Sequence, residues 1–185
     1  TKAGPDGALW CGTMRDGGRV PSGRLHHVTA DGRSRELLDG LFCPNSRAIA
    51  PDGRTLYVTD TRQGDLLQAR ADADRLELRP FAAADIAPGR PDGSTVDAEG
   101  CLWNTRTGGG QLIRLAADGR LLKTLRLPVS QPTACAFGGA DLATLYVTTA
   151  RQRLTPEQLA AEPLAGDLLA FDVGVKGLPE HRYAA

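Results

Sequence analysis

The sequence lacks any apolar stretch approaching the roughly 18 residues that a helix needs to cross a membrane. It also lacks a net charge, because 22 basic and 22 acidic residues give a formal charge of zero at pH 7. The charged residues are interspersed and form no basic run. Nucleic acid and anionic membranes are therefore poor candidates as partners.

Cysteine is also scarce, and none of the four cysteines forms a C-x-x-C pair, so a zinc–thiolate site is not indicated. Cys11, Cys101 and Cys135 fall within predicted strands, where a small buried apolar side chain is expected. Cysteines spread in this way favour a reducing, cytoplasmic setting.

What the sequence does contain is a repeat. Its aromatic anchors are Trp10, Tyr57, Trp103 and Tyr146, which lie about 43–47 residues apart, a spacing typical of β-propeller blades. Each unit has an apolar strand, a Gly-containing turn, a second strand that carries the aromatic residue, and a third strand after a polar loop. The predicted third strands are Arg24–Val28, Asp65–Ala69, Gln111–Leu115 and Asp167–Phe171. A fourth strand, such as Leu121–Leu127, is expected to close each unit.

Four strands in each unit predict an all-β fold, a β-propeller of the six-bladed type. A β-sandwich is the alternative, but sandwiches do not repeat their turn chemistry in phase. About four units fill residues 1–185, which we interpret as a single partial propeller domain. The inner strand expected before Asp6-Gly7 is reduced to a stub at Thr1–Ala3. We therefore expect the first blade to be incomplete and further blades to precede it.

Two dipeptides, Pro44-Asn45 and Pro91-Asp92, open successive units at the same position. Equivalent positions in a circular repeat lie on one ring around the axis, so both polar side chains are expected to face a common centre. An amide oxygen and a carboxylate that converge there suggest a hard cation. The alternatives are an Asx turn that leads into the strand for Asn45 and a simple turn for Asp92-Gly93.

Other polar residues are assigned by their place in the unit. Asp60 follows a second strand and is expected near the channel mouth, where it would support the site or contact the substrate. Asp52 and Asp97 fall in turn or outer regions and are expected to stabilise the blades. His26 and His27 lie on a third strand, away from the axis, and are expected at the surface or between blades.

Two further motifs have structural interpretations. Gly108–Gly110 is not followed by a helix, so it predicts a hairpin turn and not a phosphate loop. Thr155–Ala161 predicts a short surface helix, with Thr155 as the cap, Pro156 at the first position and Gln158 completing a capping box.

These motifs, in order along essentially the whole chain, resemble the senescence marker protein / regucalcin / gluconolactonase family of six-bladed propellers. The matching segments are Leu9–Met14, Pro51–Tyr57, Arg90–Gly93, Val96–Trp103, Ala136–Gly139 and Gly174–Leu178. The resemblance implies one divalent cation in the central channel, Ca²⁺ first, with Zn²⁺, Mn²⁺ or Mg²⁺ as alternatives. It also implies that Asn45 and Asp92 are two of its three protein ligands, and that the third, a Glu, and the main substrate-binding residues would lie upstream of Thr1.

The resemblance implies a metal-dependent hydrolase of sugar lactones that acts on a small molecule, with Asp92 as metal ligand and as proton acceptor.

Three residues depart from the family pattern. Ser46 and Arg47 follow Asn45 where Gly and an apolar residue are usual, and Asn104 follows Trp103 where an apolar residue is usual. Arg47 would place a fixed charge near the metal or replace a lost substrate contact. A non-catalytic propeller that binds calcium or another ligand is the alternative, and the oligomeric state is left open.

Overall fold

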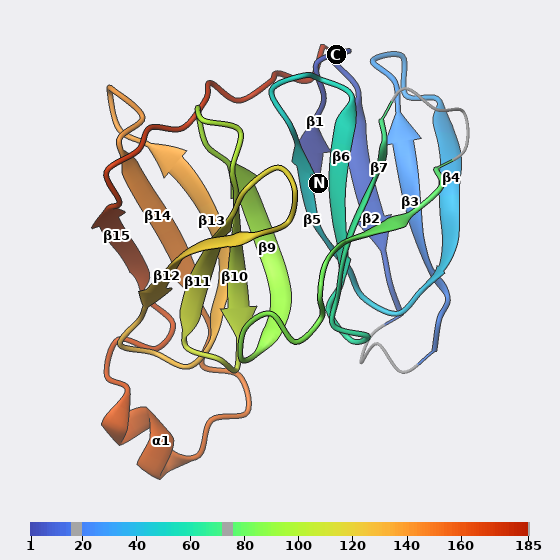
Figure 1. The fold of residues 1–185 in the computed structure, drawn as a ribbon. Coiled ribbons are helices and arrows are strands. Elements are labelled where there is room, and N and C mark those ends of the chain that lie inside the picture. The colour runs from blue at the N-terminus through green and yellow to red at the C-terminus, as the bar shows by residue number, and fades with distance from the viewer. Residues whose placement is uncertain (16–19, 72–75, 185) are drawn as a thin grey trace. The chain divides into compact units, whose positions relative to one another are not determined.

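The computed structural model describes residues 1–15, 20–71 and 76–184. These residues form four antiparallel sheets and one short helix (Figure 1). They divide into two compact units. The first consists of Thr1–Ala84 and the segment that starts at Pro179, and the second of Asp85–Leu178.

The first unit contains two four-stranded sheets in which strands adjacent in sequence pair with each other. The first sheet consists of β1 (Lys2–Ala3), β2 (Leu9–Thr13), β3 (Gly23–Val28) and β4 (Ser34–Leu41). The second consists of β5 (Pro44–Ile49), β6 (Thr55–Asp60), β7 (Asp65–Arg70) and β8 (Arg79–Ala82). The two-residue β1 agrees with the stub that the sequence predicts.

The second unit contains one four-stranded and one three-stranded sheet. The former consists of β9 (Arg90–Val96), β10 (Leu102–Thr107), β11 (Gln111–Leu115) and β12 (Leu121–Arg126). The latter consists of β13 (Pro132–Gly138), β14 (Thr144–Thr149) and β15 (Leu168–Asp172). All four predicted third strands are confirmed, as β3, β7, β11 and β15.

The prediction of a fourth strand in every unit is wrong for the last sheet, which has three strands among the described residues. After β15 the chain turns at Gly174, whose φ is 79°. It then forms an isolated antiparallel bridge between Gly177 and Asp97, the residue that directly follows β9. The chain therefore leaves β15 where a fourth strand would have to pair with it.

The turns between first and second strands explain the in-phase glycines. Gly7, Gly53, Gly100 and Gly139 all have positive φ, between 67° and 84°. This conformation is easy for glycine and costly for residues with a Cβ. The recurring glycines therefore indicate a recurring backbone conformation. This is why they predicted correctly where the first strand of each unit ends and the second begins.

The aromatic anchors contribute to the apolar packing within each unit. Trp10 packs with Leu25, Leu56 and Val58 in the first unit. Trp103 packs with Leu112, Phe137, Leu145 and Val147 in the second. Tyr146 differs from the other anchors, because 36% of its surface is exposed on β14.

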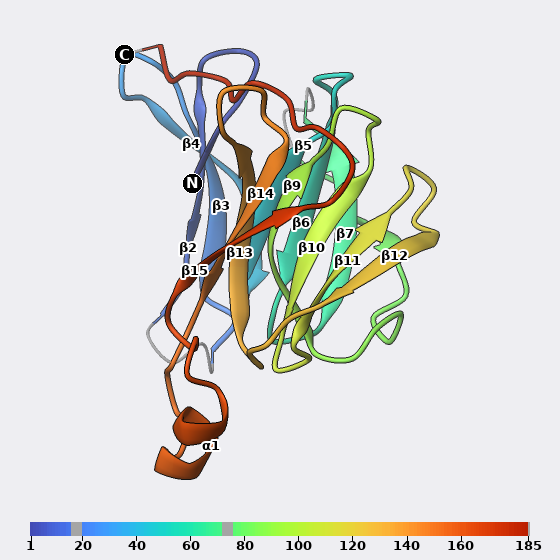
Figure 2. The same ribbon diagram turned by 90° about the vertical axis from the view of Figure 1, so that its left-hand side faces the viewer.

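The one α-helix among the described residues, α1 (Pro156–Ala161), has the predicted capping box. Thr155 Oγ1 accepts from Gln158 N, and Gln158 Oε1 accepts from Thr155 N. Both views place α1 beyond the end of the sheet formed by β13, β14 and β15 (Figures 1 and 2). Among the described residues, no helix is long and apolar enough to span a bilayer.

None of the four cysteines, all of which are described, forms a disulfide, but two details differ from the sequence interpretation. Cys101 lies just before β10 and not inside a strand, and Cys11 in β2 is only half-buried. Cys135 in β13 is buried as predicted. Burial, followed by the nearby Asp97 carboxylate, raises the pKa of the Cys101 thiol.

Candidate functional site

Asn45 is the second residue of β5 and is half-buried. Its Nδ2 donates to Thr61 Oγ1 at 2.9 Å and lies 3.7 Å from Cys43 Sγ. The amide nitrogen is therefore engaged by the protein, and Oδ1 lies on the opposite side of the planar amide. No described residue is seen to donate to Oδ1, so this side chain offers a neutral oxygen of the kind that calcium binds.

The residue after Asn45 has an unusual backbone conformation. Ser46 is buried and has a φ of 55°. The pairing of β5 with β6 shifts register between Asn45 and Ala48, so Ser46 lies in a β-bulge. A glycine would adopt this φ at lower cost, which gives a physical reason for the usual Gly at this position.

Arg47 lies in the same bulge, and its guanidinium turns back toward the start of β5. Its Nη1 donates to Pro44 O at 2.7 Å. A Cβ added to Gly12 of β2 would lie 2.8 Å from the same Nη1, so the guanidinium lies directly over Gly12. Arg47 thus places a positive charge beside the strand that carries Asn45 and holds it there through a backbone contact.

Asp60 ends β6 and is 1% exposed. Its carboxylate accepts backbone hydrogen bonds from Phe42 N at 2.8 Å, Cys43 N at 3.1 Å and Arg62 N at 3.2 Å. Two of these donors immediately precede Pro44. Asp60 therefore fixes the backbone that leads into β5, a geometry suited to supporting Asn45 and not to touching a substrate.

Asp92 occupies the corresponding place in the second unit, as the third residue of β9, and is half-buried. Its carbonyl oxygen accepts from Asn104 Nδ2 at 3.3 Å, and the same nitrogen donates to Ser94 Oγ at 2.9 Å. Asn104, the polar departure noted in the sequence, thus bridges the backbone at Asp92 to Ser94. Its Oδ1 is buried and has no partner among the described residues.

Gly93 is required at its position by close packing. A Cβ there would lie 2.6 Å from Ala134 Cα and 2.8 Å from Thr133 O, both on β13. Thr105 Oγ1 lies 3.0 Å from Gly93 O and 3.1 Å from Thr133 O and can donate to either carbonyl. The backbone beside Asp92 is therefore held against β13.

Two buried polar side chains that sequence reasoning missed hold the loop before β9. Arg106 is 1% exposed, and its Nη2 donates to Ala87 O at 2.8 Å and Gly89 O at 2.7 Å. Gln111 Nε2 donates to Pro88 O at 3.1 Å. Burial lowers the pKa of Arg106. One sequence signal could have found Arg106. It lies in a strand, two residues after Asn104 and four after Leu102, so its side chain is expected on the same face of the sheet as theirs.

The two predicted metal ligands belong to different units, Asn45 to the first and Asp92 to the second. Their convergence on one cation therefore stays a prediction. Within residues 1–15, 20–71 and 76–184, no three His, Cys, Asp or Glu side chains group closely enough to hold a metal ion. The chemistry of the two donors, one amide oxygen and one carboxylate, nevertheless fits a hard cation.

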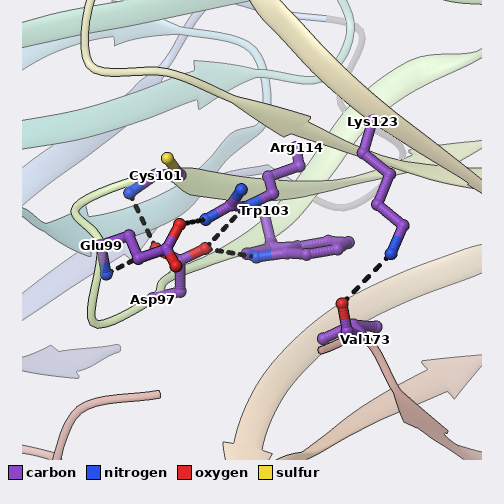
Figure 3. A network of polar contacts seen from close by, with 7 residues as sticks. All are labelled: Asp97, Glu99, Cys101, Trp103, Arg114, Lys123 and Val173. Carbon is purple, nitrogen blue, oxygen red and sulfur yellow. Dashed lines mark hydrogen bonds and ion pairs between the residues drawn. The ribbon is translucent and has the colours of Figure 1, made fainter. Parts of the chain in front are cut away.

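The structural interpretation of Asp97 is confirmed (Figure 3). Asp97 is fully buried and accepts from Glu99 N, Cys101 N, Trp103 Nε1 and Arg114 Nε, all at 2.8–3.0 Å. The Asp97 carboxylate joins the β9–β10 turn to β11. Because both of its oxygens accept hydrogen bonds from the protein, its role is structural.

Asp52 has the same kind of role in the first unit. It accepts from Arg54 N, Thr55 N and Thr55 Oγ1 within the β5–β6 turn.

His27 also has a local partner, because its Nε2 lies 2.6 Å from Asp6 Oδ2. Gly108–Gly110 forms the predicted turn between β10 and β11.

Comparison with solved structures defines the class of fold. The chain superposes on the crystal structure of regucalcin from Agrobacterium tumefaciens, described as a calcium-binding protein, with a TM-score of 0.93 and 34% identity. The match covers 100% of this chain and 63% of that one. The four sheets are therefore blades, and the fold is an all-β propeller, as the sequence predicts.

Sequence comparison defines the family. Residues 1–151 match the profile of the SMP-30/Gluconolactonase/LRE-like region. A 6-deoxy-6-sulfogluconolactonase of Pseudomonas putida is 37% identical over 97% of this chain and 63% of its own length. A pentonolactonase of Haloferax volcanii is 33% identical over 97% of this chain and 64% of its own length. The chain belongs to this family and spans just under two thirds of the length of these relatives.

Proposed function

We propose that this chain forms part of a divalent-cation-dependent sugar lactone hydrolase in which Asn45 and Asp92 supply two of the metal ligands. The observation that carries the proposal is the orientation of Asn45. Thr61 and Cys43 engage its amide nitrogen, which leaves Oδ1 as the open donor atom. The lactonase names of the relatives support the reaction class.

Lactone hydrolysis forms a bond from a water oxygen to the carbonyl carbon, breaks the ring C–O bond and moves a proton to the ring oxygen, which gives a hydroxy acid. A bound divalent cation would polarise the carbonyl and orient the water. We propose Ca²⁺ for this position, with Zn²⁺, Mn²⁺ and Mg²⁺ as alternatives.

The chain's own residues would then have three tasks. Asn45 contributes a neutral oxygen, and Asp92 contributes a charged one. We propose that Asp92 would also take a proton from water, although a carboxylate bound to a cation is a weaker base, so ligation is the role we favour. Asp60 holds the backbone that presents Asn45. Arg47 lies beside the same strand, where we propose that it meets a polar group of the substrate.

The test is acid release from D-glucono-1,5-lactone in a pH-indicator assay with Ca²⁺, Mn²⁺, Zn²⁺ or a chelator. We expect chelation to abolish turnover, and Asp92→Asn to lower it by about 100-fold or more, since even an outer partner of a metal ligand is worth about 10–100-fold. Asp118→Asn, in an exposed turn, is the control and should retain activity. Turnover that survives both the chelator and Asp92→Asn would contradict the proposal.

The resemblance also predicts that this chain alone is a weak lactonase, since the third ligand and the main substrate-binding residues would lie upstream of Thr1. A version extended upstream by roughly 100 residues, or about two blades, should be much more active. Equal turnover from both versions would show that the upstream residues are dispensable.

The alternative is a non-catalytic propeller that binds calcium. The strained Ser46 and the charged Arg47 beside Asn45 favour it, because both depart from the usual pattern at this position. Calorimetric Ca²⁺ binding without lactonase activity in the extended version would favour this alternative. In either case we propose a reducing cytoplasmic setting, which cysteines that form no disulfide support.

A further inference from the structure

A pocket of about 560 Å³ lies in the second unit, between the start of β9, the β10–β11 turn, the segment before β13 and the helix α1. Its lining includes Arg90, Thr107, Gln131, Arg153 and Gln158. The volume falls within the range of small-molecule sites, about 300–1,000 Å³.

The charge of this pocket is its most specific property. It is lined by two arginines and by no aspartate or glutamate. In the part of the chain that the structure describes, neither the Arg90 nor the Arg153 guanidinium forms an ion pair or a hydrogen bond. Glu162 is not among the lining residues, but its Oε2 accepts from Ser130 N at 2.7 Å and Ser130 Oγ at 2.9 Å, and Ser130 does line the pocket. Two arginines without an ion pair thus line one concavity in a chain of zero formal charge.

The backbone around both arginines is held in place. Arg90 pairs with Thr107 across β9 and β10, and the preceding loop is fixed by the buried Arg106. Arg153 has a φ of 65°, which is costly for a residue with a Cβ. It lies two residues before Thr155, the N-cap of α1. Backbone strain at a residue that lines a pocket is typical of ligand-binding sites.

The pocket also lies at the same end of its sheets as the candidate ligand Asp92. β9 begins at Arg90, two residues before Asp92, and β10 runs antiparallel to it and ends at Thr107. α1 lies beyond the same end of the neighbouring sheet (Figures 1 and 2). A ligand that approached Asp92 from this end would pass these arginines.

We propose that Arg90 and Arg153 bind an oxyanion, and that this oxyanion is the charged substituent of an acidic sugar lactone. The substrate assignment rests on the function proposed above, whereas the anion site stands on the pocket alone. Guanidinium groups bind carboxylate, sulfonate and phosphate through paired hydrogen bonds. A neutral aldonolactone carries no such group before its ring opens, so it would not use this pocket.

The kinetic test compares an aldarolactone, which carries one carboxylate, with D-glucono-1,5-lactone, which is neutral. We expect the Arg90→Gln/Arg153→Gln variant to raise KM for the aldarolactone by about tenfold and to leave the gluconolactone KM within about twofold, as expected for a lost charge-assisted contact. Arg126→Gln, at an exposed arginine on β12, is the matched control and should change neither value. An equal effect on both lactones would overturn the substrate assignment.

A binding test separates this proposal from the proposed function. The aldarate dianion and inorganic sulfate are titrated calorimetrically into the chain, a measurement that needs no turnover. We expect both to bind, with affinity falling as salt rises, and both to lose at least about tenfold in the double variant but not in Arg126→Gln. Unchanged aldarate binding in a folded double variant would overturn the anion site. Sulfate binding without any lactone discrimination would overturn the substrate assignment, leaving a site for free oxyanions.

Discussion

The starts of β5 and β9 occupy the same place in successive blades, yet the residue after each candidate ligand is constrained in a different way. Ser46 follows Asn45 with a positive φ that favours glycine. Gly93 follows Asp92 with no positive φ, but there is no space for a Cβ against β13. Position 46 therefore has a side chain although its backbone conformation favours glycine, whereas position 93 needs glycine because there is no space for a Cβ.

The backbone at each candidate ligand is also held by different side chains. At β5 a buried carboxylate, Asp60, fixes the preceding backbone through two N–H donors, Phe42 N and Cys43 N. At β9 the fixing comes from neighbouring strands, through Thr105 and Asn104. In both units a residue of the second strand holds the start of the first strand, and in the second unit packing of Gly93 against β13 of the neighbouring sheet is added. Substitutions can separate these contributions.

The largest effect is expected for Gly93→Ser. Its Cβ would overlap backbone atoms of Ala134 and Thr133, which cannot rotate away, so unfolding should become easier by about 3 kcal/mol, the upper end for overpacking. Urea unfolding measures this change. Ala136→Ser, at an exposed position on β13, is the control, with a change within about 0.5 kcal/mol. A Gly93→Ser protein as stable as the wild type would show that β9 does not pack as described.

The next effect is expected for Asp60→Asn. The side-chain amide of asparagine would turn an N–H group toward backbone N–H donors, which leaves buried donors without acceptors. The free energy of unfolding should therefore fall by about 1–3 kcal/mol. Hydrogen exchange should rise locally at Phe42 and Cys43, while the Asp97 network should be unaffected. Unchanged exchange at both amides would rule out the supporting role of Asp60.

A smaller effect of opposite sign is expected for Ser46→Gly. Relief of the positive φ outweighs the added flexibility of glycine, so stability should increase by up to about 1 kcal/mol. Ser46→Ala keeps the Cβ and serves as the matched variant without this gain. If both variants change stability equally, the hydroxyl and not the backbone is responsible.

The smallest effect is a pH dependence at Asp52. Burial alone would raise the pKa of this carboxyl, but hydrogen bonds from Arg54 and Thr55 outweigh it and hold the pKa below the ordinary 3.8. A depressed folded pKa means that the stabilisation is present above about pH 4 and is lost as the pH falls through the folded value. The stability difference between the wild type and Asp52→Asn should therefore shrink between pH 6 and pH 2.5 in urea titrations. A constant difference would contradict this assignment.

The strands could be predicted from the sequence because their signals are local. The glycines at the β-turns have positive φ, and Trp10, Tyr57 and Trp103 recur in buried second strands. The loss of a fourth strand after β15 could not be predicted, since it depends on the bridge between Gly177 and Asp97, 80 residues apart in the chain.

The candidate ligands stand out in the sequence, whereas the residues that support them do not. Pro44-Asn45 and Pro91-Asp92 are visible as repeated dipeptides. Arg106 is not, because its role depends on carbonyls 17 and 19 residues away. Asp60 was noticed, but two of its backbone donors, Phe42 N and Cys43 N, depend on how the end of β6 meets the start of β5.

The central claim is that Asn45 and Asp92 bind the same divalent cation, and Mn²⁺ relaxation in NMR tests it most directly. We predict that sub-stoichiometric Mn²⁺ broadens the amide signals of Asn45 and Asp92 together, and that Asp92→Asn reduces the broadening at both. Broadening at one residue alone, or broadening at Asn45 that is unchanged in Asp92→Asn, would contradict a shared metal centre.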